Sequence, residues 1–204
     1  YAGAGETMMS IAVRCAEEGL GGMEFASGIP GTLGGTVSMN AGAYEKEMKD
    51  IVNSVRILTQ EGEIKEISNA EMAFGYRTSA VLKNNWIVLG ATLQLQQDDP
   101  VEIQARIDDF THRRRTRQPL EYASAGSTFK RPEGYFVGKL VMDAGFSGYA
   151  VGGAKVSEKH CGFLINAGGA TASDVMELIR QIQAKVKEQF GVTLEPEVKF
   201  LGKF

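Results

Sequence analysis

Three polar segments carry side chains suited to a reaction in which negative charge develops on a substrate. Phe-Gly-Tyr-Arg-Thr-Ser at 74–79 contains Arg77, Ala-Gly-Ser-Thr-Phe-Lys at 125–130 contains Ser127, and Leu-Glu-Pro-Glu-Val-Lys at 194–199 contains Glu197. A fixed guanidinium stabilises a developing anion, and a hydroxyl can donate a proton when a nearby charge assists it. Each residue also has a structural interpretation, as a solvated arginine, a turn hydroxyl or a charge on an edge strand. The residue types alone leave both interpretations open.

A glycine-dense segment, Gly-Ile-Pro-Gly-Thr-Leu-Gly-Gly-Thr-Val-Ser-Met-Asn-Ala-Gly-Ala-Tyr at 28–44, is the strongest candidate for a binding surface. Glycine is 25 of 204 residues, where the usual share predicts about 14. Bare backbone lets N–H groups approach a ligand, and a following helix start would add unpaired N–H groups and its positive dipole end. Such groups suit an anionic or flat, oxygen-rich cofactor. The candidate cofactor-binding residues are Gly31, Thr32, Gly34, Gly35, Asn40, Ala41 and Gly42.

The spacing of these glycines excludes two common nucleotide-binding motifs. It does not match the Gly-x-Gly-x-x-Gly pattern of dinucleotide-binding folds, and the sequence has no Gly-x4-Gly-Lys-Ser/Thr phosphate loop. The alternative interpretation of the segment is an ordinary glycine-rich turn that permits close helix packing.

Composition argues against several other classes of protein. Only His112 and His160 are present, and no Cys-x-x-Cys occurs, so we expect no zinc site. No general base lies near Ser127 in the sequence, which argues against a serine hydrolase. The net charge is -3, and the one basic run, at 113–117, lacks interleaved aromatic residues, so we expect no nucleic-acid partner. Arginines at the end of a helix also complement its dipole.

The apolar runs and the cysteines bear on the environment of the chain. No apolar stretch approaches the roughly 18 to 20 residues that cross a bilayer. Cys15 and Cys161 lie far apart in apolar runs and are interpreted as free thiols, with His160 and Cys161 structural. We therefore expect a cytoplasmic protein without a membrane partner.

Hydrophobic periodicity predicts the elements that must position these residues. In the first half we expect a helix at 7–18 capped by Thr7, strands at 51–60, 63–67 and 86–96, and a helix at 101–117. In the second half we expect irregular chain at 121–134, a helix at 135–144, strands near 150–156, 162–167 and 192–201, and a helix at 173–190. Strands and helices do not alternate regularly, which favours the α+β class. We place a boundary between subdomains 1–97 and 98–204.

The order of the motifs resembles that of the UDP-N-acetylenolpyruvoylglucosamine reductase family. The resemblance combines Gly-Ile-Pro-Gly-Thr-Leu-Gly-Gly, Met-Asn-Ala-Gly-Ala-Tyr, Tyr-Arg-Thr-Ser, Ala-Gly-Ser-Thr-Phe-Lys, Val-Ser-Glu-Lys-His-Cys-Gly-Phe-Leu-Ile-Asn-Ala-Gly and Glu-Pro-Glu-Val-Lys-Phe-Leu-Gly. It extends over residues 2–202 and is specific because every motif occurs in family order.

The resemblance implies an FAD enzyme of peptidoglycan precursor synthesis, a process that supports cell-wall formation, cell shape and division. NADPH reduces the flavin, and hydride then passes to the enolpyruvyl ether of UDP-N-acetylglucosamine to give UDP-N-acetylmuramate. Ser127 resembles the residue that protonates the enolic carbon, and Arg77 and Glu197 resemble the pair that stabilises the enolate or enol. The segment at 31–42 resembles part of the flavin pocket, and Lys130 lies in the substrate-facing loop.

Two departures from the family pattern shape the remaining expectations. Glu45 stands where the family usually has glycine. The family also carries a further small domain, with a turn that cradles the flavin pyrophosphate, ahead of Ala-Gly-Ala-Gly. We therefore expect an N-terminally truncated member of the shorter subclass: the second half of a PCMH-type flavin domain at 1–97, and an α+β substrate-binding domain at 98–204. The alternatives are an inactive UDP-sugar-binding module, or another oxidoreductase of the same flavin superfamily.

Overall fold

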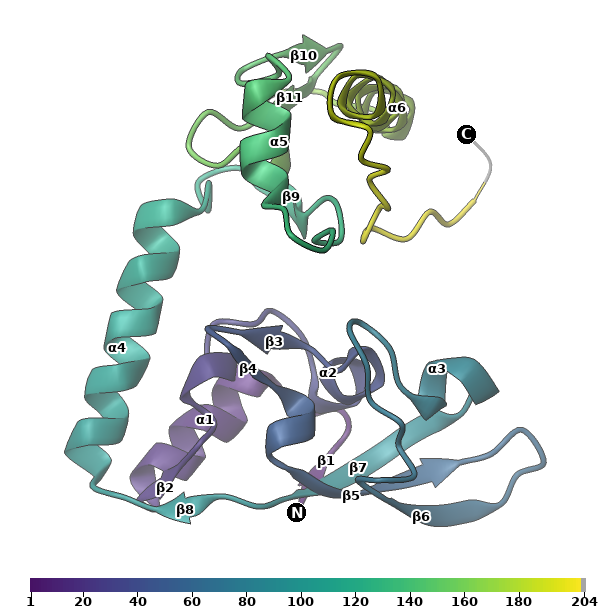
Figure 1. The fold of residues 1–204 in the computed structure, drawn as a ribbon. Helices are drawn as coiled ribbons and strands as arrows, with labels where there is room; N and C mark the ends of the chain where they lie inside the picture. The colour runs from purple at the N-terminus through teal and green to yellow at the C-terminus, as the bar shows by residue number, and fades with distance from the viewer. Residues whose placement is uncertain (203–204) are drawn as a thin grey trace. The chain divides into compact units, whose positions relative to one another are not determined.

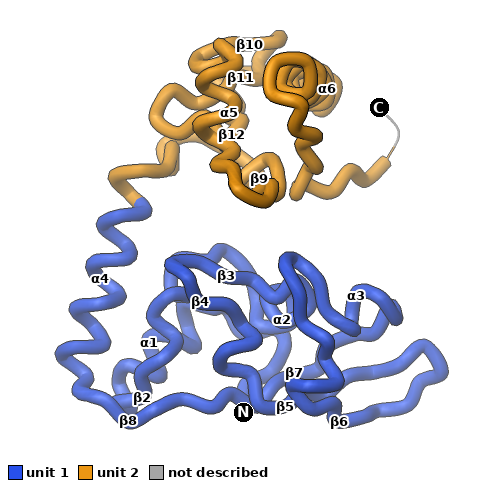
Figure 2. The backbone as a smooth tube through the Cα atoms, viewed as in Figure 1, with its two compact units in different colours: residues 1–114 blue, residues 115–204 orange. Residues whose placement is uncertain are grey.

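Antiparallel sheets with packed helices make up both units of the chain, residues 1–114 and 115–204 (Figure 2). The computed structural model describes residues 1–202. The mixture of elements confirms the α+β class. The boundary expected between 97 and 98 precedes helix α4 (Pro100–Arg117), whereas the two units divide between Arg114 and Arg115. Most of α4 lies with the first unit because Ile103 and Ile107 are buried against Ala16.

A four-stranded sheet in the order β1–β7–β5–β6 forms the base of the first unit (Figure 1). The strands are β1 (Ala2–Gly3), β5 (Val52–Leu58), β6 (Ile64–Ser68) and β7 (Ile87–Leu93). The last three confirm the expected strands. Val55 and Ile57 of β5 are fully buried, while Arg56 between them is exposed.

Helix α1 (Met8–Glu17) confirms the expected helix and its cap. The Thr7 hydroxyl accepts a hydrogen bond from the Ser10 N–H at 3.1 Å, which satisfies one of the unpaired donors at the helix start. Met8, Ile11 and Cys15 then face the core at helical spacing. Both cysteines are free and buried, as expected. Short elements complete this unit: β2 (Leu20–Gly21), η1 (Glu24–Ala26), η2 (Met48–Asp50), α3 (Ala80–Asn84) and β8 (Gln96–Gln97).

The glycine-dense segment forms a helix and a hairpin. Helix α2 (Leu33–Met39) buries Leu33, Thr36 and Val37, and packs against β7. Strands β3 (Gly42–Ala43) and β4 (Lys46–Glu47) then pair around a two-residue turn of Tyr44 and Glu45, whose φ angles are 52° and 66°. Tight hairpin turns require positive φ at both positions, which explains why glycine suits position 45.

The second unit is a sheet in the order β10–β11–β12–β9 packed against two helices. Its strands are β9 (Ala123–Ser127), β10 (Ala150–Val151), β11 (Ala154–Val156) and β12 (Phe163–Asn166), and its helices are α5 (Val137–Asp143) and α6 (Ala172–Phe190). Thr171 and Asp174 form a reciprocal capping box at the start of α6, and Gly191 ends the helix in the left-handed conformation. Leu178, Ile182 and Val186 are fully buried along its apolar stripe.

Two expectations for the second unit are wrong. The region expected to be irregular, 121–134, contains strand β9, which pairs with β12. The strand expected at 192–201 is instead extended chain with one isolated bridge, between Phe129 and Pro196. Pro196 has no N–H to donate, so it cannot extend a ladder of hydrogen bonds.

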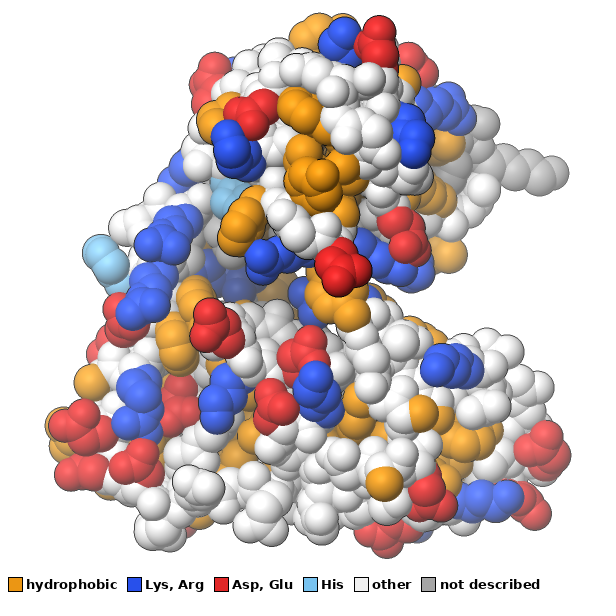
Figure 3. All heavy atoms as spheres, in the orientation of Figure 1, with side chains coloured by type: hydrophobic (Ala, Val, Ile, Leu, Met, Phe, Trp, Pro, Cys, Tyr) orange, Lys and Arg blue, Asp and Glu red, His pale blue; other side chains and the backbone are white. Residues whose placement is uncertain are grey.

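Acidic and basic side chains are interspersed on the face that Figure 3 shows, in agreement with the small net charge. In the part of the chain that the structure describes, no helix combines the length and the apolar character needed to span a bilayer. Within residues 1–202, no three His, Cys, Asp or Glu side chains gather as a metal site would require.

Glu45 is predicted to be a strained position. A non-glycine residue in the left-handed region costs about 1–2 kcal/mol, so Glu45→Gly should raise the free energy of unfolding by about 1 kcal/mol after the added chain entropy of glycine is subtracted. Chemical denaturation measures this change. The control is Glu133→Gly, because Glu133 is exposed and lies outside the left-handed region. The free energy of unfolding of Glu133→Gly should be unchanged or lower. A similar increase in the free energy of unfolding of both variants would contradict the predicted strain at Glu45.

Candidate active site

The three predicted catalytic residues lie in both units, Arg77 in the first, and Ser127 and Glu197 in the second. In each unit, hydrogen bonds from neighbouring residues hold the segment that carries the predicted residue.

Arg77 lies at the tip of a tight loop in the first unit. Gly75 and Thr78 pair through two backbone hydrogen bonds, of 3.0 and 3.3 Å, which leaves Tyr76 and Arg77 as the turn. Arg77 has a φ of 55°, and its half-buried guanidinium lies 5.0 Å from the centre of the Tyr76 ring. A cation over an aromatic face is held in direction, so this loop presents a fixed positive charge.

Asn40 ties this loop to the glycine-dense segment. It is completely buried and ends α2 in the left-handed conformation, with a φ of 44°. Its side-chain NH₂ group donates to the Gly75 carbonyl and to the Glu47 carboxylate, each at 3.0 Å. Its side-chain oxygen accepts from the Lys49 N–H at 2.9 Å. These three bonds occupy both N–H groups and the oxygen of the Asn40 amide. The side chain therefore links the Arg77 loop to the segments that contain Glu47 and Lys49.

A second contact holds the other end of the Arg77 loop. The buried Ser79 hydroxyl donates at 2.8 Å to the carbonyl of Ser38, the residue before the last one of α2. The loop is therefore fixed at both ends to the same short helix. Sequence reasoning identified Arg77 and Asn40 separately, but the contact between their loops joins positions 35 residues apart and had no local signal.

The candidate glycines fall into two groups. A Cβ atom on Gly34 would lie 3.0 Å from the Ala4 Cβ, and one on Gly42 would lie 2.5 Å from the Lys46 carbonyl oxygen. Close packing within the chain therefore explains these two glycines. Gly31 and Gly35 are exposed, neither has positive φ, and no atom within 3.4 Å would crowd a Cβ on either. Packing and backbone conformation within the chain therefore do not require glycine at either position.

The start of α2 contributes less than expected. The Leu33 and Gly34 N–H groups donate to the carbonyl groups of Glu6 and Ala4, both at 2.9 Å. These two donors are therefore not open to a ligand. Thr32, the N-cap residue, is exposed, and its side chain makes no capping hydrogen bond.

In the second unit, Thr128 connects the segments that carry Ser127 and Glu197. Its backbone N–H donates to the Gly162 carbonyl at 2.9 Å, and its carbonyl accepts from the Glu197 N–H at 2.8 Å. Its buried hydroxyl accepts from the Leu164 N–H at 3.2 Å. Ser127 therefore ends β9 with an exposed side chain, one residue from the contact that positions Glu197.

A groove of about 340 Å³ opens beside this connection, lined by β9, β12, the start of α6 and Val198. Next to it, the Lys130 N–H donates to the Glu195 carbonyl at 2.8 Å, and the two side chains form an ion pair. Lys130 is thus bound to the C-terminal segment rather than turned freely to solvent.

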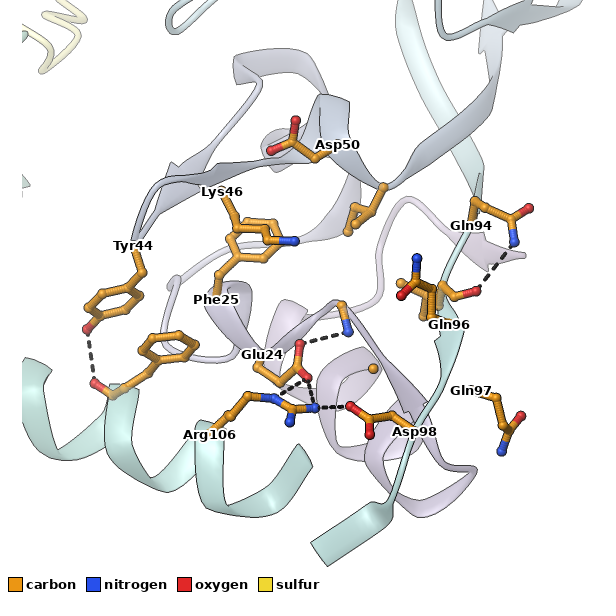
Figure 4. A pocket seen from close by; sticks show the side chains of 15 residues that line it. Glu24, Phe25, Tyr44, Lys46, Asp50, Gln94, Gln96, Gln97, Asp98 and Arg106 are labelled. Carbon is orange, nitrogen blue, oxygen red and sulfur yellow. Dashed lines mark hydrogen bonds and ion pairs between the residues drawn. The ribbon is translucent and has the colours of Figure 1, made fainter. Parts of the chain in front are cut away.

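The first unit also contains a separate cavity of about 560 Å³ that holds none of the predicted catalytic residues (Figure 4). Its charged centre is Arg106, which binds the Glu24 carboxylate at 2.8 Å and also pairs with Asp98. Glu24 is 7% exposed, so this pair neutralises a buried carboxylate. Sequence reasoning did not identify this cluster, which joins residues 82 positions apart.

Comparisons with protein families match both units. Residues 118–201 match the family model described as UDP-N-acetylenolpyruvoylglucosamine reductase, C-terminal domain. Residues 1–68 match the family model described as FAD binding domain.

Individual relatives agree with these matches. The UDP-N-acetylenolpyruvoylglucosamine reductase of Lachnoclostridium phytofermentans is 55% identical over 98% of this chain and 64% of its own length. The one of Clostridioides difficile is 58% identical over 90% of this chain and 60% of its own length. The crystal structure of the UDP-N-acetylenolpyruvylglucosamine reductase from Thermus caldophilus superposes on this chain with a TM-score of 0.83 and is 34% identical in sequence. The match includes 95% of this chain and 70% of the Thermus caldophilus chain. The chain thus spans about 64% of the first of these relatives.

Asn40 is predicted to hold the Arg77 loop in place. Asn40→Gly keeps the left-handed backbone but removes the side-chain hydrogen bonds, so the variant should lose about 2 kcal/mol of stability. The Gly75 and Thr78 amides should also exchange with solvent faster, which NMR hydrogen exchange measures. Asn85→Gly is the matched control, because Asn85 ends α3 at a φ of 52° with an exposed side chain. Unchanged protection of the loop amides in Asn40→Gly would contradict the predicted role.

Proposed function

Because the chain belongs to the UDP-N-acetylenolpyruvoylglucosamine reductase family, we propose that it carries the catalytic groups of an FAD-dependent reductase. The proposed substrate is UDP-N-acetylglucosamine enolpyruvate, the proposed reductant is NADPH, and the product is UDP-N-acetylmuramate. This activity would place the protein in the cytoplasm, in peptidoglycan precursor synthesis, where it would serve cell-wall formation, cell shape and division. The observation that carries the proposal is the high identity to reductases across both units.

The residues of the first unit fit a flavin. Gly31 and Gly35 leave exposed backbone with open space where a side chain would stand. Thr32 lies between these two glycines in the sequence, and its hydroxyl makes no capping hydrogen bond to α2. We assign Gly31, Thr32, Gly35 and Ala41 to the flavin side of the unit, and Gly34, Asn40 and Gly42 to its support.

The flavin supplies the hydride chemistry when it is bound, and the residues of this chain supply binding, orientation and proton handling. Addition of hydride to an alkene that bears a carboxylate builds negative charge on that carboxylate. The Arg77 guanidinium, fixed in its loop, is proposed to stabilise this charge. Glu197 is proposed to hydrogen-bond the same enol.

Ser127 is proposed to donate the proton that completes the reduction. Its side chain is exposed, and its hydroxyl makes no hydrogen bond to any residue of the described range 1–202. A serine hydroxyl is a poor acid in water, so it needs a neighbouring charge during the reaction. Thr128 holds the Ser127 and Glu197 segments together, so that the two side chains can serve one substrate.

Removal of the Ser127 hydroxyl tests the proposed reaction. In a protein of the relatives' full length that contains this chain, Ser127→Ala should lower kcat about 100-fold or more, the usual scale for loss of a general acid. The assay follows NADPH oxidation that depends on the enolpyruvyl substrate. Ser147→Ala, at an exposed serine of the same unit that does not line the groove, should change kcat by less than about twofold. Normal turnover by Ser127→Ala would rule out Ser127 as the donor, and absence of turnover in the unmodified protein would rule out the reductase.

A further inference from the structure

Three residues of α4, Arg106, Phe110 and Arg114, face the first unit at intervals of four, a spacing that places side chains on one face of a helix. Arg106 donates to the Glu24 carboxylate at 3.0 and 2.8 Å. Phe110 stacks on Tyr44, with ring centres 4.2 Å apart, and its carbonyl accepts from the Tyr44 hydroxyl at 3.0 Å. The first two members of the row therefore have specific partners in the unit.

Arg114, the third member, lies against Gly28, at the start of the glycine-dense segment. A Cβ atom on Gly28 would lie 3.1 Å from the Arg114 Cδ and 3.3 Å from its Nη1. A Cβ at position 28 would therefore require the Arg114 side chain to move by a few tenths of an ångström. The contact brings a positive charge next to the backbone that leads into the proposed flavin surface.

The guanidinium of Arg114 has no counter-charge. Its neighbour Arg113 pairs with Asp109 at 2.7 Å, and Arg106 pairs with two carboxylates. Arg114, by contrast, forms neither an ion pair nor a hydrogen bond with any described residue of the chain. It is half-buried, and this burial lowers its pKa below the ordinary value, although an arginine remains charged at neutral pH.

The position of Arg114 in the last turn of α4 does not account for this arrangement. Cations are favoured there by the helix dipole, and the exposed Arg115 and Arg117 satisfy that preference in solvent. The dipole does not require a guanidinium that is turned inward and partly desolvated. A partly buried charge without a partner is unfavourable, and an anionic ligand relieves that cost.

We propose that Arg114 binds an oxyanion of the flavin cofactor beside Gly28. The assignment of this anion to a flavin rests on the proposed function. A flavin nucleotide carries negative charge on its phosphates in both redox states, and on its ring system after reduction. The planar fork of a guanidinium can donate two parallel hydrogen bonds to either kind of oxyanion.

The test uses the ¹⁵N-labelled chain and the NMR signal of the Arg114 side-chain Nε–Hε group, identified by its loss in Arg114→Gln. The probes are inorganic pyrophosphate, FMN, oxidised riboflavin and dithionite-reduced riboflavin. We expect a saturable shift of the Arg114 signal with at least one flavin probe. Arg114→Gln should weaken binding of that probe about tenfold or more, and the matched Arg113→Gln should change it by less than about twofold.

The probes distinguish the two sources of the anion. A response to FMN and pyrophosphate, but not to reduced riboflavin, assigns Arg114 to the phosphates. A response to reduced but not oxidised riboflavin assigns it to the ring. An Arg114 signal that no flavin moves would overturn the inference, even if pyrophosphate binds. Equal weakening by Arg113→Gln and Arg114→Gln would also overturn it, because the effect would then be general charge. Neither outcome depends on turnover, so loss of reductase activity remains a separate result.

Discussion

The buried amide of Asn40 is the contact on which the candidate site of the first unit depends. A fully buried amide must satisfy its polar atoms within the protein, because an unpaired polar group away from water is costly. Asn40 does so by joining the Arg77 loop, Glu47 at the end of the β3–β4 hairpin and the backbone of Lys49. It also ends α2 in a conformation that asparagine tolerates better than most residues. The left-handed backbone of Asn40 and its side-chain hydrogen bonds therefore both fix the position of the Arg77 loop relative to the glycine-dense segment.

An ion pair and a ring stack hold α4 to the rest of this unit. Glu24 is buried and paired with Arg106, so α4 is held to the unit by a neutralised contact, and the Tyr44–Phe110 stack adds an apolar one. Arg114 differs from both contacts, because its half-buried guanidinium has no counter-charge among the described residues. The second unit uses backbone hydrogen bonds instead, since main-chain groups of Thr128 link the segments that carry Ser127 and Glu197.

The sequence predicted the long elements α1, β5, β7, α4 and α6, and the signal was clearest for α1 and α6, which each bury a regular stripe of apolar residues. Short segments without a stripe were harder to predict. Strand β9 consists of Ala, Ser and Gly, and it forms because β12 offers a partner far along the chain. The C-terminal segment alternates like a strand, yet Pro196 limits its pairing. The family resemblance supplied Arg77, Ser127 and Glu197. No local pattern could show that Asn40 is buried, that Gly34 and Gly42 are packing requirements, or that Arg114 lacks a partner, because each depends on contacts that the fold creates.

The affinity for FAD of a Gly31→Ala variant tests most directly whether the exposed backbone of the glycine-dense segment faces the flavin. The measurement is a titration of the variant, within a protein of the relatives' full length, together with its Tm. A Cβ at position 31 meets no other atom of the chain within 4 Å, so the Tm should change by less than about 2 °C. If the flavin lies against this backbone, the added methyl group should raise the Kd for FAD about tenfold or more. An unchanged Kd in a stably folded variant would contradict the account.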